Sequence, residues 1–477
     1  MTGVVDWAAY LPHYLLRLSE IGSVLGSAQP AGTRSVASYD EDTTSMAVEA
    51  ARPVVRGLAR ALAPPRVYFA TTHPAYLDKT NAAVIHAALG LPRATLAVDL
   101  GGAPRSAVGA LLAAADCPEG ALAVLADIRT GLPGGADEKQ GGDAAAALLF
   151  GPGTSERPVL AELITSASVT DEFLDRWRSP GAPASRVWEE RFGENIYVPL
   201  AMESFSAALK QADLTPNDVD HLVVCGLSPR ANRQFATGSG VPREAIAPDL
   251  TKAIGNPGTA QPGVLLADVL ERAKPDQVIA LAVLADGAST LILRTTEALA
   301  AHQPSAPTVA DQIAAADTSV SYGTFLTWRG MLQREPPRRP EPDAPAGPPS
   351  HRSENWKYGF IGSHCEQCGT VHLPPARVCF RCGSADRMHP QPMADTAARV
   401  ATYTVDRLAY TPSPPMIAVV VDFDGGGRFR CEFTDAPPEV AIGEDVEMTF
   451  RRLTTSEGGV HNYFWKARPA RRKIEEI

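Results

Sequence analysis

Short apolar runs alternate with longer segments of helical periodicity from residue 4 to about residue 300. This alternation predicts an α/β domain with a largely parallel sheet. Two comparable halves, one ending near Gly151 and one spanning Met202 to Leu293, are consistent with an internally duplicated αβαβα sandwich. We expect strands at 67–70, 96–100, 122–126, 145–150, 221–225, 278–284 and 289–293, and helices at 42–62 (with a kink at Pro53), 81–89, 105–115, 197–212 and 262–272.

One predicted helix is central to this domain. A strand runs into a Gly101-Gly102 corner, and the helix follows from Pro104. No polar side chain occurs from Ala107 to Ala115, and a helix that is apolar on every face is expected to be buried. Its first turn would direct N–H groups and the positive end of the helix dipole at a thiolate, an oxyanion or a phosphate. Alternatively, the proline and the glycines serve only as a helix start and a turn.

The pattern changes beyond residue 333. Residues 334–352 are rich in proline and predict an extended, semi-rigid linker, whereas residues 321–332 just before it predict a short amphipathic helix. Strand signals at 398–403, 416–423, 428–433, 446–451 and 462–466, with a triple-glycine turn, predict a small barrel of the oligomer-binding (OB) type. The predicted division is an α/β domain at 1–300, a connecting helical segment at 301–333, the linker at 334–352, a cysteine-containing ribbon at 353–390 and the barrel at 391–477.

Composition narrows the class of protein. The 477 residues contain 45% hydrophobic residues and carry a formal net charge of -10, which argues against a nucleic-acid-binding surface. The chain start lacks a basic region followed by an apolar core, and no apolar run approaches the length of a membrane span. We therefore expect a cytoplasmic protein with neither a nucleic-acid nor a membrane partner.

Four of the seven cysteines form a Cys-x2-Cys-x10-Cys-x2-Cys block. Its members are Cys365, Cys368, Cys379 and Cys382. Two such knuckles can turn four thiolates toward one tetrahedral ion, so the spacing predicts a structural zinc rather than disulfides. An iron centre of rubredoxin type would use the same ligands, and a nucleic-acid-binding ribbon is a further alternative. The other three cysteines are scattered, as in a reducing compartment.

These residues carry two family resemblances. The ribbon, the Leu373-Pro374-Pro375 between its knuckles and the following barrel resemble the DUF35 proteins, which pair a rubredoxin-like zinc ribbon with an OB-fold and accompany acyl-CoA enzymes. The first three hundred residues resemble the thiolase superfamily, especially its ketoacyl-synthase III and HMG-CoA-synthase branch. The matching stretches are AAYLP at 8–12, SMAVEAAR at 45–52, 67–91, QGGDAAAALLFG at 140–151 and IGNPGTAQPG at 254–263. The resemblance implies a five-layered αβαβα sandwich, usually dimeric, that binds acyl-CoA.

The chain departs from this branch at the residues that perform its chemistry. The family's nucleophilic cysteine aligns with Pro104, and its histidine aligns with Pro229 or Arg230, whereas its asparagine is retained as Asn256. The general-base glutamate of HMG-CoA synthases is also missing. Without a thiolate, the acyl-cysteine intermediate of the family cannot form. Cys225 is the nearest other thiol, and we interpret it as a buried, inert residue.

The remaining chemistry is acid-base catalysis beside a CoA thioester, as in aldol or retro-aldol reactions. We expect an acyl-CoA lyase (aldolase) that resembles the thiolase-like steroid side-chain aldolases associated with DUF35 proteins, and a homodimer. The alternatives are an acyltransferase of the HMG-CoA-synthase or ketoacyl-synthase kind with another nucleophile, and a non-catalytic acyl-CoA-binding scaffold. The OB domain is expected to cover the mouth of the acyl-CoA site.

Candidate site residues come from two polar loops and two glycine-rich corners. The loops are HPAYLDK at 73–79 and DIRTGLPGGADEKQGGD at 127–143, since long charged loops after buried strands often carry sites. Arg105 either binds a carboxylate or phosphate or ties down the neighbouring sheet. The predicted catalytic residues are His73, Tyr76, Asp137, Glu138 and Asn256, and the predicted substrate-binding residues are Gly101, Gly102, Arg105 and Gly255.

Overall fold

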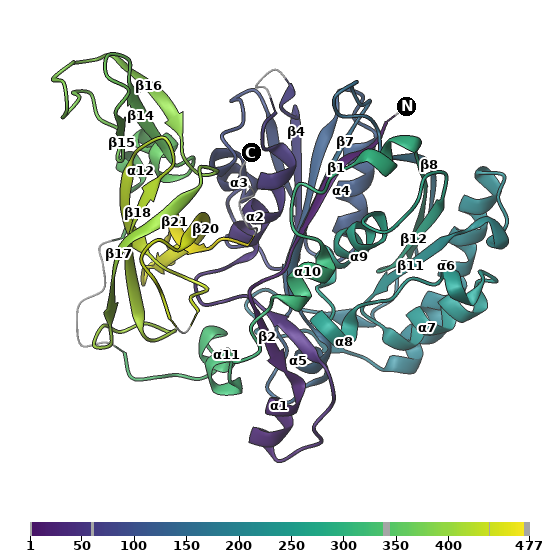
Figure 1. The fold of residues 1–477 in the computed structure, drawn as a ribbon. Coiled ribbons are helices and arrows are strands. Elements are labelled where there is room, and N and C mark those ends of the chain that lie inside the picture. Colours follow the sequence, from purple (N-terminus) through teal and green to yellow (C-terminus); the bar gives the residue numbers. More distant parts are fainter. Residues whose placement is uncertain (1, 59–61, 337–343, 438, 472–477) are drawn as a thin grey trace.

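A computed structural model describes residues 2–58, 62–336, 344–437 and 439–471 (Figure 1). A nine-stranded sheet runs through the larger domain in the order β11-β12-β13-β8-β1-β7-β6-β4-β5. Its strands are β1 (Gly3–Tyr10), β4 (Arg66–Thr71), β5 (Leu96–Gly101), β6 (Ala121–Ile128), β7 (Asp143–Gly151), β8 (Ala161–Val169), β11 (His221–Gly226), β12 (Val278–Leu284) and β13 (Ala288–Thr295). β1 pairs with β7 along its whole length but with β8 only at Gly3 and Val4, so the sheet consists of two halves joined at one corner.

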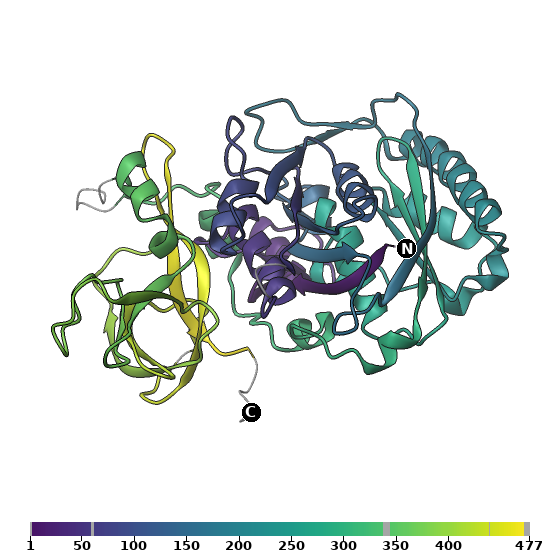
Figure 2. The same cartoon turned by 90° about the horizontal axis from the view of Figure 1, so that it is seen from above.

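Helices form three layers around these halves. The outer helices α2 (Thr43–Val55) and α3 (Ala82–Ala88) pack on the first half, and α6 (Glu190–Gln211) and α7 (Pro229–Gly238) pack on the second. The inner helices α4 (Ser106–Ala115) and α9 (Gln261–Leu270) lie between the halves, in one apolar core with strands of both. The predicted αβαβα sandwich is therefore confirmed (Figures 1 and 2).

Most predicted elements are present, and two strands of the nine-stranded sheet were missed. The seven strands expected in this domain match within two residues at each end. β1 was not expected because a buried aspartate, Asp6, interrupts its apolar pattern; this carboxylate accepts from Ser305 and from the backbone of Trp7. β8 was missed as well, since its sequence AELITSASV is half polar. Helix α2 ends at Val55, seven residues before the predicted end at 62, and residues 59–61 lie outside the described chain.

Shorter elements complete this part of the chain. They are β2 (Tyr14–Arg17), α1 (Leu18–Leu25), β3 (Thr33–Val36), α5 (Ala136–Gln140), β9 (Arg176–Trp177), β10 (Arg186–Val187), α8 (Thr251–Ile254), and the 3-10 turns η2 (Pro216–Asp218), η3 (Arg243–Ala245), η4 (Gly258–Ala260) and η5 (Glu297–Ala301). Within the described residues, no helix has the length and apolar character needed to cross a bilayer.

The expectation that the central helix is buried on every face is wrong. In α4, Gly109 is exposed, and Leu112 and Ala113 are only partly buried. The neighbouring strand β5 is the last strand of the sheet, and Leu96 on it is 52% exposed. Because β5 is an edge strand, the described chain leaves this apolar side of the layer open.

The connection to the second domain is more helical than predicted. Helices α10 (Val309–Ala314) and α11 (Tyr322–Trp328) precede it, and α11 is the expected amphipathic helix. The prediction of an extended linker is wrong for α12 (Gly347–Arg352), which is followed by α13 (Glu354–Lys357). Its prolines stand in the first turn, where a missing N–H costs no intrahelical hydrogen bond. Residues 337–343 of the predicted linker lie outside the described chain.

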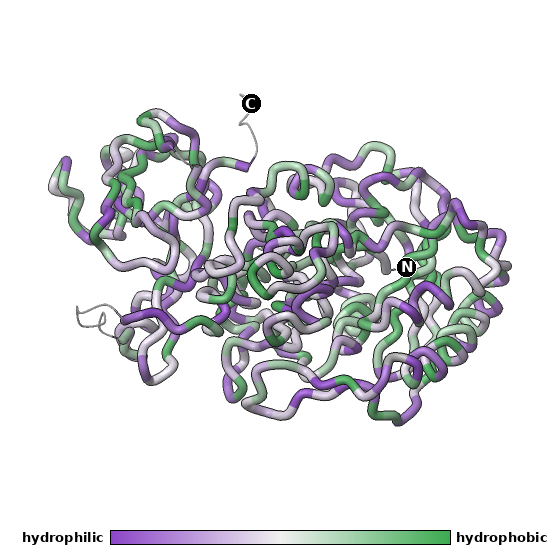
Figure 3. The backbone as a smooth tube through the Cα atoms, turned by 90° about the horizontal axis from the view of Figure 1, so that it is seen from below, coloured by the Kyte–Doolittle hydropathy of each residue, from purple (hydrophilic) through white to green (hydrophobic). Residues whose placement is uncertain are grey.

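The second domain consists of a ribbon and a barrel. The ribbon sheet has the order β15-β14-β16, with β14 (Ile361–Cys365), β15 (Val371–His372) and β16 (Met388–Pro392). The barrel sheet has the order β19-β18-β17-β20-β21, with β17 (Ala398–Asp406), β18 (Met416–Phe423), β19 (Arg428–Glu432), β20 (Asp445–Thr455) and β21 (His461–Pro469). Just after β19, Phe433 donates to Ile417 of β18 and Thr434 donates to Ala467 of β21, so the chain after β19 lies against β21. Hydrophobic and hydrophilic residues are interspersed in the barrel (Figure 3), and β18 buries every second residue. The predicted OB-type barrel is confirmed.

Buried ion pairs fix the barrel to the larger domain. Arg451 of β20 contacts Glu41 at 2.8 Å, and Arg468 of β21 contacts Glu49 of α2 at 2.7 Å. Although burial alone would raise the pKa of Glu49, the charges of Arg468 and Arg52 hold it at about 2. Because these charges have lost their water, the pairs resist separation of the two domains.

Candidate active site and metal centre

A cavity of about 410 Å³ lies at the N-terminal end of α4, where the two halves of the sheet meet. We call it the helix-end cavity. It collects the C-terminal ends of strands from both halves, which is where ligands bind in open α/β sheets. Its lining consists of Thr72, His73, Pro74, Leu77, Gly102–Pro104, Arg129, Asp175–Ala182, Ser185, Tyr197, Leu227, Ser228 and Leu284–Asp286. All of these residues belong to the larger domain, so among the described residues the OB barrel does not cover the cavity as expected.

The corner before α4 opens directly into this cavity. Gly102 has a φ of 101°, which only glycine adopts without strain, while a Cβ there would meet no atom within 4 Å. Two backbone hydrogen bonds form the first turn of the helix. The N–H of Ser106 donates to the carbonyl of Ala103, and the N–H of Ala107 donates to the carbonyl of Pro104. Pro104 therefore occupies the end of the helix dipole without a side-chain nucleophile and without an N–H.

His73 lines the cavity from the loop after β4. Its backbone N–H donates to Thr71 at 3.0 Å, and its carbonyl accepts from Thr43 of α2 at 2.8 Å. Loss of water around the ring lowers the pKa of His73 below its ordinary value, although the nearby carboxylate of Asp127 acts in the opposite direction. The imidazole is therefore neutral near pH 7 and can accept a proton.

Asp127, at the end of β6, anchors the base of this loop. Its carboxylate is buried and accepts from the hydroxyl of Thr72 at 2.8 Å and from the backbone N–H and hydroxyl of Thr259 at 3.1 Å. These donors hold the ends of β4, β6 and η4 together. Asp127 therefore fixes the base of the loop that carries His73.

Three polar residues that sequence reasoning missed face the same cavity. The hydroxyl of Tyr197 donates to Asp175 at 3.3 Å and accepts from the backbone N–H of Asp286 at 3.4 Å. Desolvation and then the charge of Asp286 raise the pKa of Asp175. The sequence signals at these positions indicate only local structure, since Asp286-Gly287 is a hairpin-turn pair and Tyr197 lies inside a helix.

The structure places three of the predicted catalytic residues in other contacts. The Tyr76 hydroxyl accepts from the backbone of His461 in the barrel. Asp137 pairs with Arg176 at 2.7 Å. Glu138 is buried, and it accepts hydrogen bonds from the hydroxyl of Tyr322 and from a backbone N–H; burial raises its pKa. Glu138 therefore ties α11 to the 127–143 loop.

Asn256 lies in a separate hollow of about 230 Å³, the Asn256 cavity. Its amide nitrogen donates to Gly226 and its amide oxygen accepts from Gly258, both at 2.9 Å. A Cβ on Gly255 would lie 2.1 Å from the carbonyl oxygen of Gly141, so this glycine allows two backbones to touch. The Asn256 cavity shares Arg129 and Leu227 with the helix-end cavity, but His73 lines only the helix-end cavity and Asn256 lines only its own.

The two remaining predicted binding residues flank α4. Arg105 donates to the carbonyl of Asp286 and to the hydroxyl of Thr170, so it ties the helix to the second half of the sheet. Of the two roles predicted for Arg105, the structure therefore shows the one in which it ties down the neighbouring sheet. It does so by donating to a carbonyl group rather than by forming an ion pair. Gly101 is exposed at the end of β5.

A second hollow of about 700 Å³ adjoins the helix-end cavity, and we call it the adjoining groove. The two share Asp175, Arg176, Ser185, Leu227 and Ser228. Its other lining residues are Gly131, Leu132, Gly135–Asp137, Gln140, Ala184, Val187–Glu189, Gly193, Pro229, Arg230 and Arg233. The groove thus combines arginines at the start of α7 with the exposed ring of Trp188.

None of the seven cysteines lines the helix-end cavity within the described chain. Cys225 is buried in β11, and desolvation raises its pKa well above the ordinary value. A buried thiol of this kind stays protonated and is a poor nucleophile.

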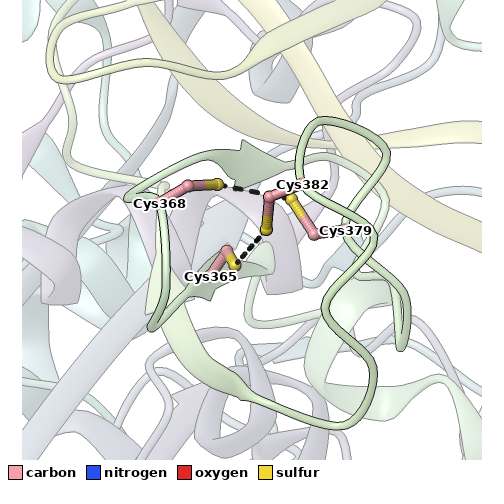
Figure 4. Close-up of side chains that lie close together, drawn as sticks. All are labelled: Cys365, Cys368, Cys379 and Cys382. Carbon is pink, nitrogen blue, oxygen red and sulfur yellow. Dashed lines mark hydrogen bonds between the residues drawn. The ribbon is translucent and has the colours of Figure 1, made fainter.

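The four ribbon cysteines converge on one point (Figure 4). Their sulfur atoms all lie within 4.8 Å of one another, with Cys365 at 3.7 Å from Cys382 and Cys368 at 3.5 Å from Cys379. Four thiolates around zinc at about 2.3 Å would be separated by about 3.8 Å. The ligand set and its spacing fit a closed tetrahedral site for a structural zinc.

Two family models match parts of the second domain. Residues 357–386 match the ChsH2 rubredoxin-like zinc ribbon domain, and residues 391–451 match the ChsH2 C-terminal OB-fold domain. The chain is also similar to hydroxymethylglutaryl-CoA synthases. That of Pyrobaculum neutrophilum is 28% identical over 351 residues, covering 69% of this chain and 98% of the relative, and that of Aeropyrum pernix is 29% identical over 348 residues, covering 69% and 94%.

Solved structures share the fold of the larger domain. A crystal structure of HMG-CoA synthase complexed with CoA has a TM-score of 0.60 at 18% identity and covers 68% of this chain and 89% of its own. The 3-oxoacyl-(acyl carrier protein) synthase III of Pseudomonas aeruginosa PAO1 has a TM-score of 0.54 at 20% identity and covers 62% and 98%. The thiolase-like fold expected from the sequence is therefore confirmed.

Proposed function

Because the chain joins a thiolase-like domain, similar in sequence to hydroxymethylglutaryl-CoA synthases, to a zinc ribbon and an OB-fold of the ChsH2 families, we propose that it is an enzyme acting on CoA thioesters. It makes or breaks the carbon-carbon bond next to the thioester by an aldol or retro-aldol reaction, without an acyl-enzyme. One observation carries this proposal: the end of α4 opens into a cavity that holds Pro104 and His73 but no cysteine.

The adjoining groove, of about 700 Å³, has the size to take the nucleotide part of CoA. Arg230 and Arg233 supply cations for phosphates, and the ring of Trp188 offers an apolar face. The pantetheine arm then passes the shared residues Asp175 and Ser185 into the helix-end cavity. The thioester ends beside Gly102 and Pro104, within the field of the helix dipole.

The retro-aldol step requires one base and an oxyanion site. His73 takes the proton of the β-hydroxyl group, the bond between the α and β carbons breaks, and the β carbon leaves as a carbonyl compound. The bonding electrons form the enolate of the shorter acyl-CoA, whose oxygen is stabilised by the positive end of α4. The enolate is then protonated at its α carbon by His73 or by Asp175, so the reaction involves no net oxidation or reduction. The condensation is the reverse of these steps.

A screen of β-hydroxyacyl-CoAs tests this function. Chromatography should detect both products, the carbonyl compound and the shorter acyl-CoA, in equal amounts. Binding of CoA thioesters without turnover of any substrate would favour a non-catalytic scaffold. Transfer of an acyl group from acetyl-CoA to the protein would favour an acyltransferase instead.

We also propose that two copies of the chain associate through β5 and α4. Leu96 and Gly109 are exposed there, and β5 is an edge strand with unpaired backbone groups on one side. Light scattering after gel filtration should give twice the chain mass of 50.5 kDa. Leu112→Glu should shift the particle to one chain, and a monomeric wild-type protein would refute the association.

A further inference from the structure

One arginine in the helix-end cavity makes no side-chain hydrogen bond or ion pair with the residues that the structure describes. Arg129 follows β6, and its side chain is buried, with the residue only 7% exposed. Among the residues that the structure describes, no acceptor lies within hydrogen-bonding or ion-pair distance of its guanidinium. The neighbouring arginines differ, since Arg176 pairs with Asp137 and Arg178 donates to the carbonyl of Thr72.

The position of Arg129 is nevertheless tightly fixed. Its backbone N–H donates to Asp143 at 3.0 Å. Its side chain runs between two glycines, because a Cβ on Gly141 would lie 2.8 Å from the Arg129 Cβ, and a Cβ on Gly258 would lie 2.9 Å from its Cδ. The backbone thus holds the aliphatic part of the side chain, and Arg129 is a lining residue of both the helix-end cavity and the Asn256 cavity.

The carboxylate of Asp127 does not neutralise this charge by direct contact. Its oxygens are occupied by donors from Thr72 and Thr259. The charges of Asp127 and Asp137 attract the guanidinium from a distance, but a buried guanidinium without a direct hydrogen-bond acceptor still destabilises a fold unless a ligand supplies one. The lining of the helix-end cavity contains three arginines and two carboxylates, Asp175 and Asp286, and Arg176 is already paired with Asp137.

We propose that Arg129 binds a carboxylate carried by the acyl chain of the substrate, so that the enzyme acts on acyl-CoA thioesters with a second acidic group. This inference rests on the proposed function for its CoA part. A planar guanidinium matches a carboxylate through two parallel hydrogen bonds. The CoA phosphates have their own cations in Arg230 and Arg233 of the adjoining groove.

Binding of matched thioesters tests the inference without requiring turnover. Calorimetry would compare glutaryl-CoA with the thioester of its terminal amide, which has the same shape and no charge. The wild-type protein should bind glutaryl-CoA about 10- to 100-fold more tightly, the range for hydrogen bonds to a charged group. Arg129→Met should bind both equally, with the affinity for the amide unchanged. Arg93→Gln, at an exposed position, should behave as wild type.

The melting temperature without ligand provides a second measurement. Arg129→Met should melt no lower than wild type, because the substitution removes a buried charge that has no partner to lose. Equal binding of both thioesters by the wild-type protein, or retained discrimination in Arg129→Met, would overturn the inference and leave the proposed function intact.

Free anions separate this inference from the proposed function. If no CoA thioester binds, but free glutarate raises the melting temperature of wild type and not of Arg129→Met, the proposed function fails and the carboxylate site stands. If no CoA thioester binds and glutarate does not change the melting temperature either, both the proposed function and the carboxylate site are refuted. Equal protection by inorganic phosphate would assign Arg129 to a phosphate group and overturn the carboxylate assignment.

Discussion

The hydroxyl of Tyr76 accepts a hydrogen bond of 2.8 Å from the backbone N–H of His461. The two rings lie 4.7 Å apart between centroids, and the Nε2 atom of His461 lies 3.3 Å from the carbonyl oxygen of Ala75. Tyr76 is only three residues from His73 on the loop after β4. The hairpin of β20 and β21 therefore supports the loop of the proposed base from behind.

This contact predicts unequal effects for two substitutions in one loop. His73→Phe should lower turnover of the cleaved β-hydroxyacyl-CoA by about 100-fold or more, as expected for loss of a general base. Tyr76→Phe removes only one acceptor from a backbone N–H, worth about 0.5–1.5 kcal/mol, and should lower turnover less than about tenfold. Steady-state rates of both variants check this. Equal losses of turnover in the two variants would show that Tyr76 takes part in catalysis.

The pH dependence of the rate reports the state of His73. A base must be unprotonated, and desolvation lowers the pKa of His73 below its ordinary value of 6.5. The value of kcat/KM should therefore be constant near neutral pH and should fall as the pH drops through a midpoint below 6.5. A midpoint above 6.5, or the same profile in His73→Phe, would show that another group is the base.

Metal content tests the ribbon. Elemental analysis of the purified protein should find one zinc per chain, and Cys379→Ser should lose both the zinc and the stability of the second domain, since the binding energy of a structural zinc is also folding energy. Cys431→Ser, in the barrel strand β19, should keep its zinc. Iron in place of zinc would correct the identity of the metal, and absence of both metals would refute the site.

The buried pairs between the domains predict a further stability difference. Arg451 faces Glu41 and Asp435 with no exposed surface, so Arg451→Met would leave carboxylates without their counter-charge and should cost about 3–5 kcal/mol. Arg428→Gln breaks only a surface pair with Asp422 and should change little. Urea unfolding followed by tryptophan fluorescence checks both variants. Equal midpoints would mean that the pairs between the domains contribute nothing.

The fold could be predicted largely from the sequence because most helices and strands have a recognisable pattern within their own residues. The strands at 278–284 and 416–423 have the predicted bounds, since each is a short apolar or alternating run between turn signals. β1 was missed because the partners that satisfy Asp6 lie far away in the sequence. The partly exposed face of α4 was missed for a related reason. An apolar helix sequence indicates that the helix is buried, but not whether its own chain or another chain buries it.

The sequence predicted lining residues of the candidate cavity only where they follow the ends of strands. His73 and Gly102 each follow a predicted strand, and the ends of neighbouring parallel strands meet. Asp175 and Tyr197 reach the cavity from a long irregular segment and from a helix, and no local pattern marks them. Glu138 has the residue type and the loop of a catalytic acid, yet the folded chain uses it to bind α11.

The account depends most on the claim that a CoA thioester reacts at the end of α4 without becoming attached to the protein. Intact-protein mass spectrometry during turnover of a cleaved β-hydroxyacyl-CoA tests this directly. The account predicts an unmodified mass of the chain at every time of quenching, while the shorter acyl-CoA accumulates. An acyl adduct that forms and decays at the rate of turnover, on Cys225 or on any other residue, would contradict it.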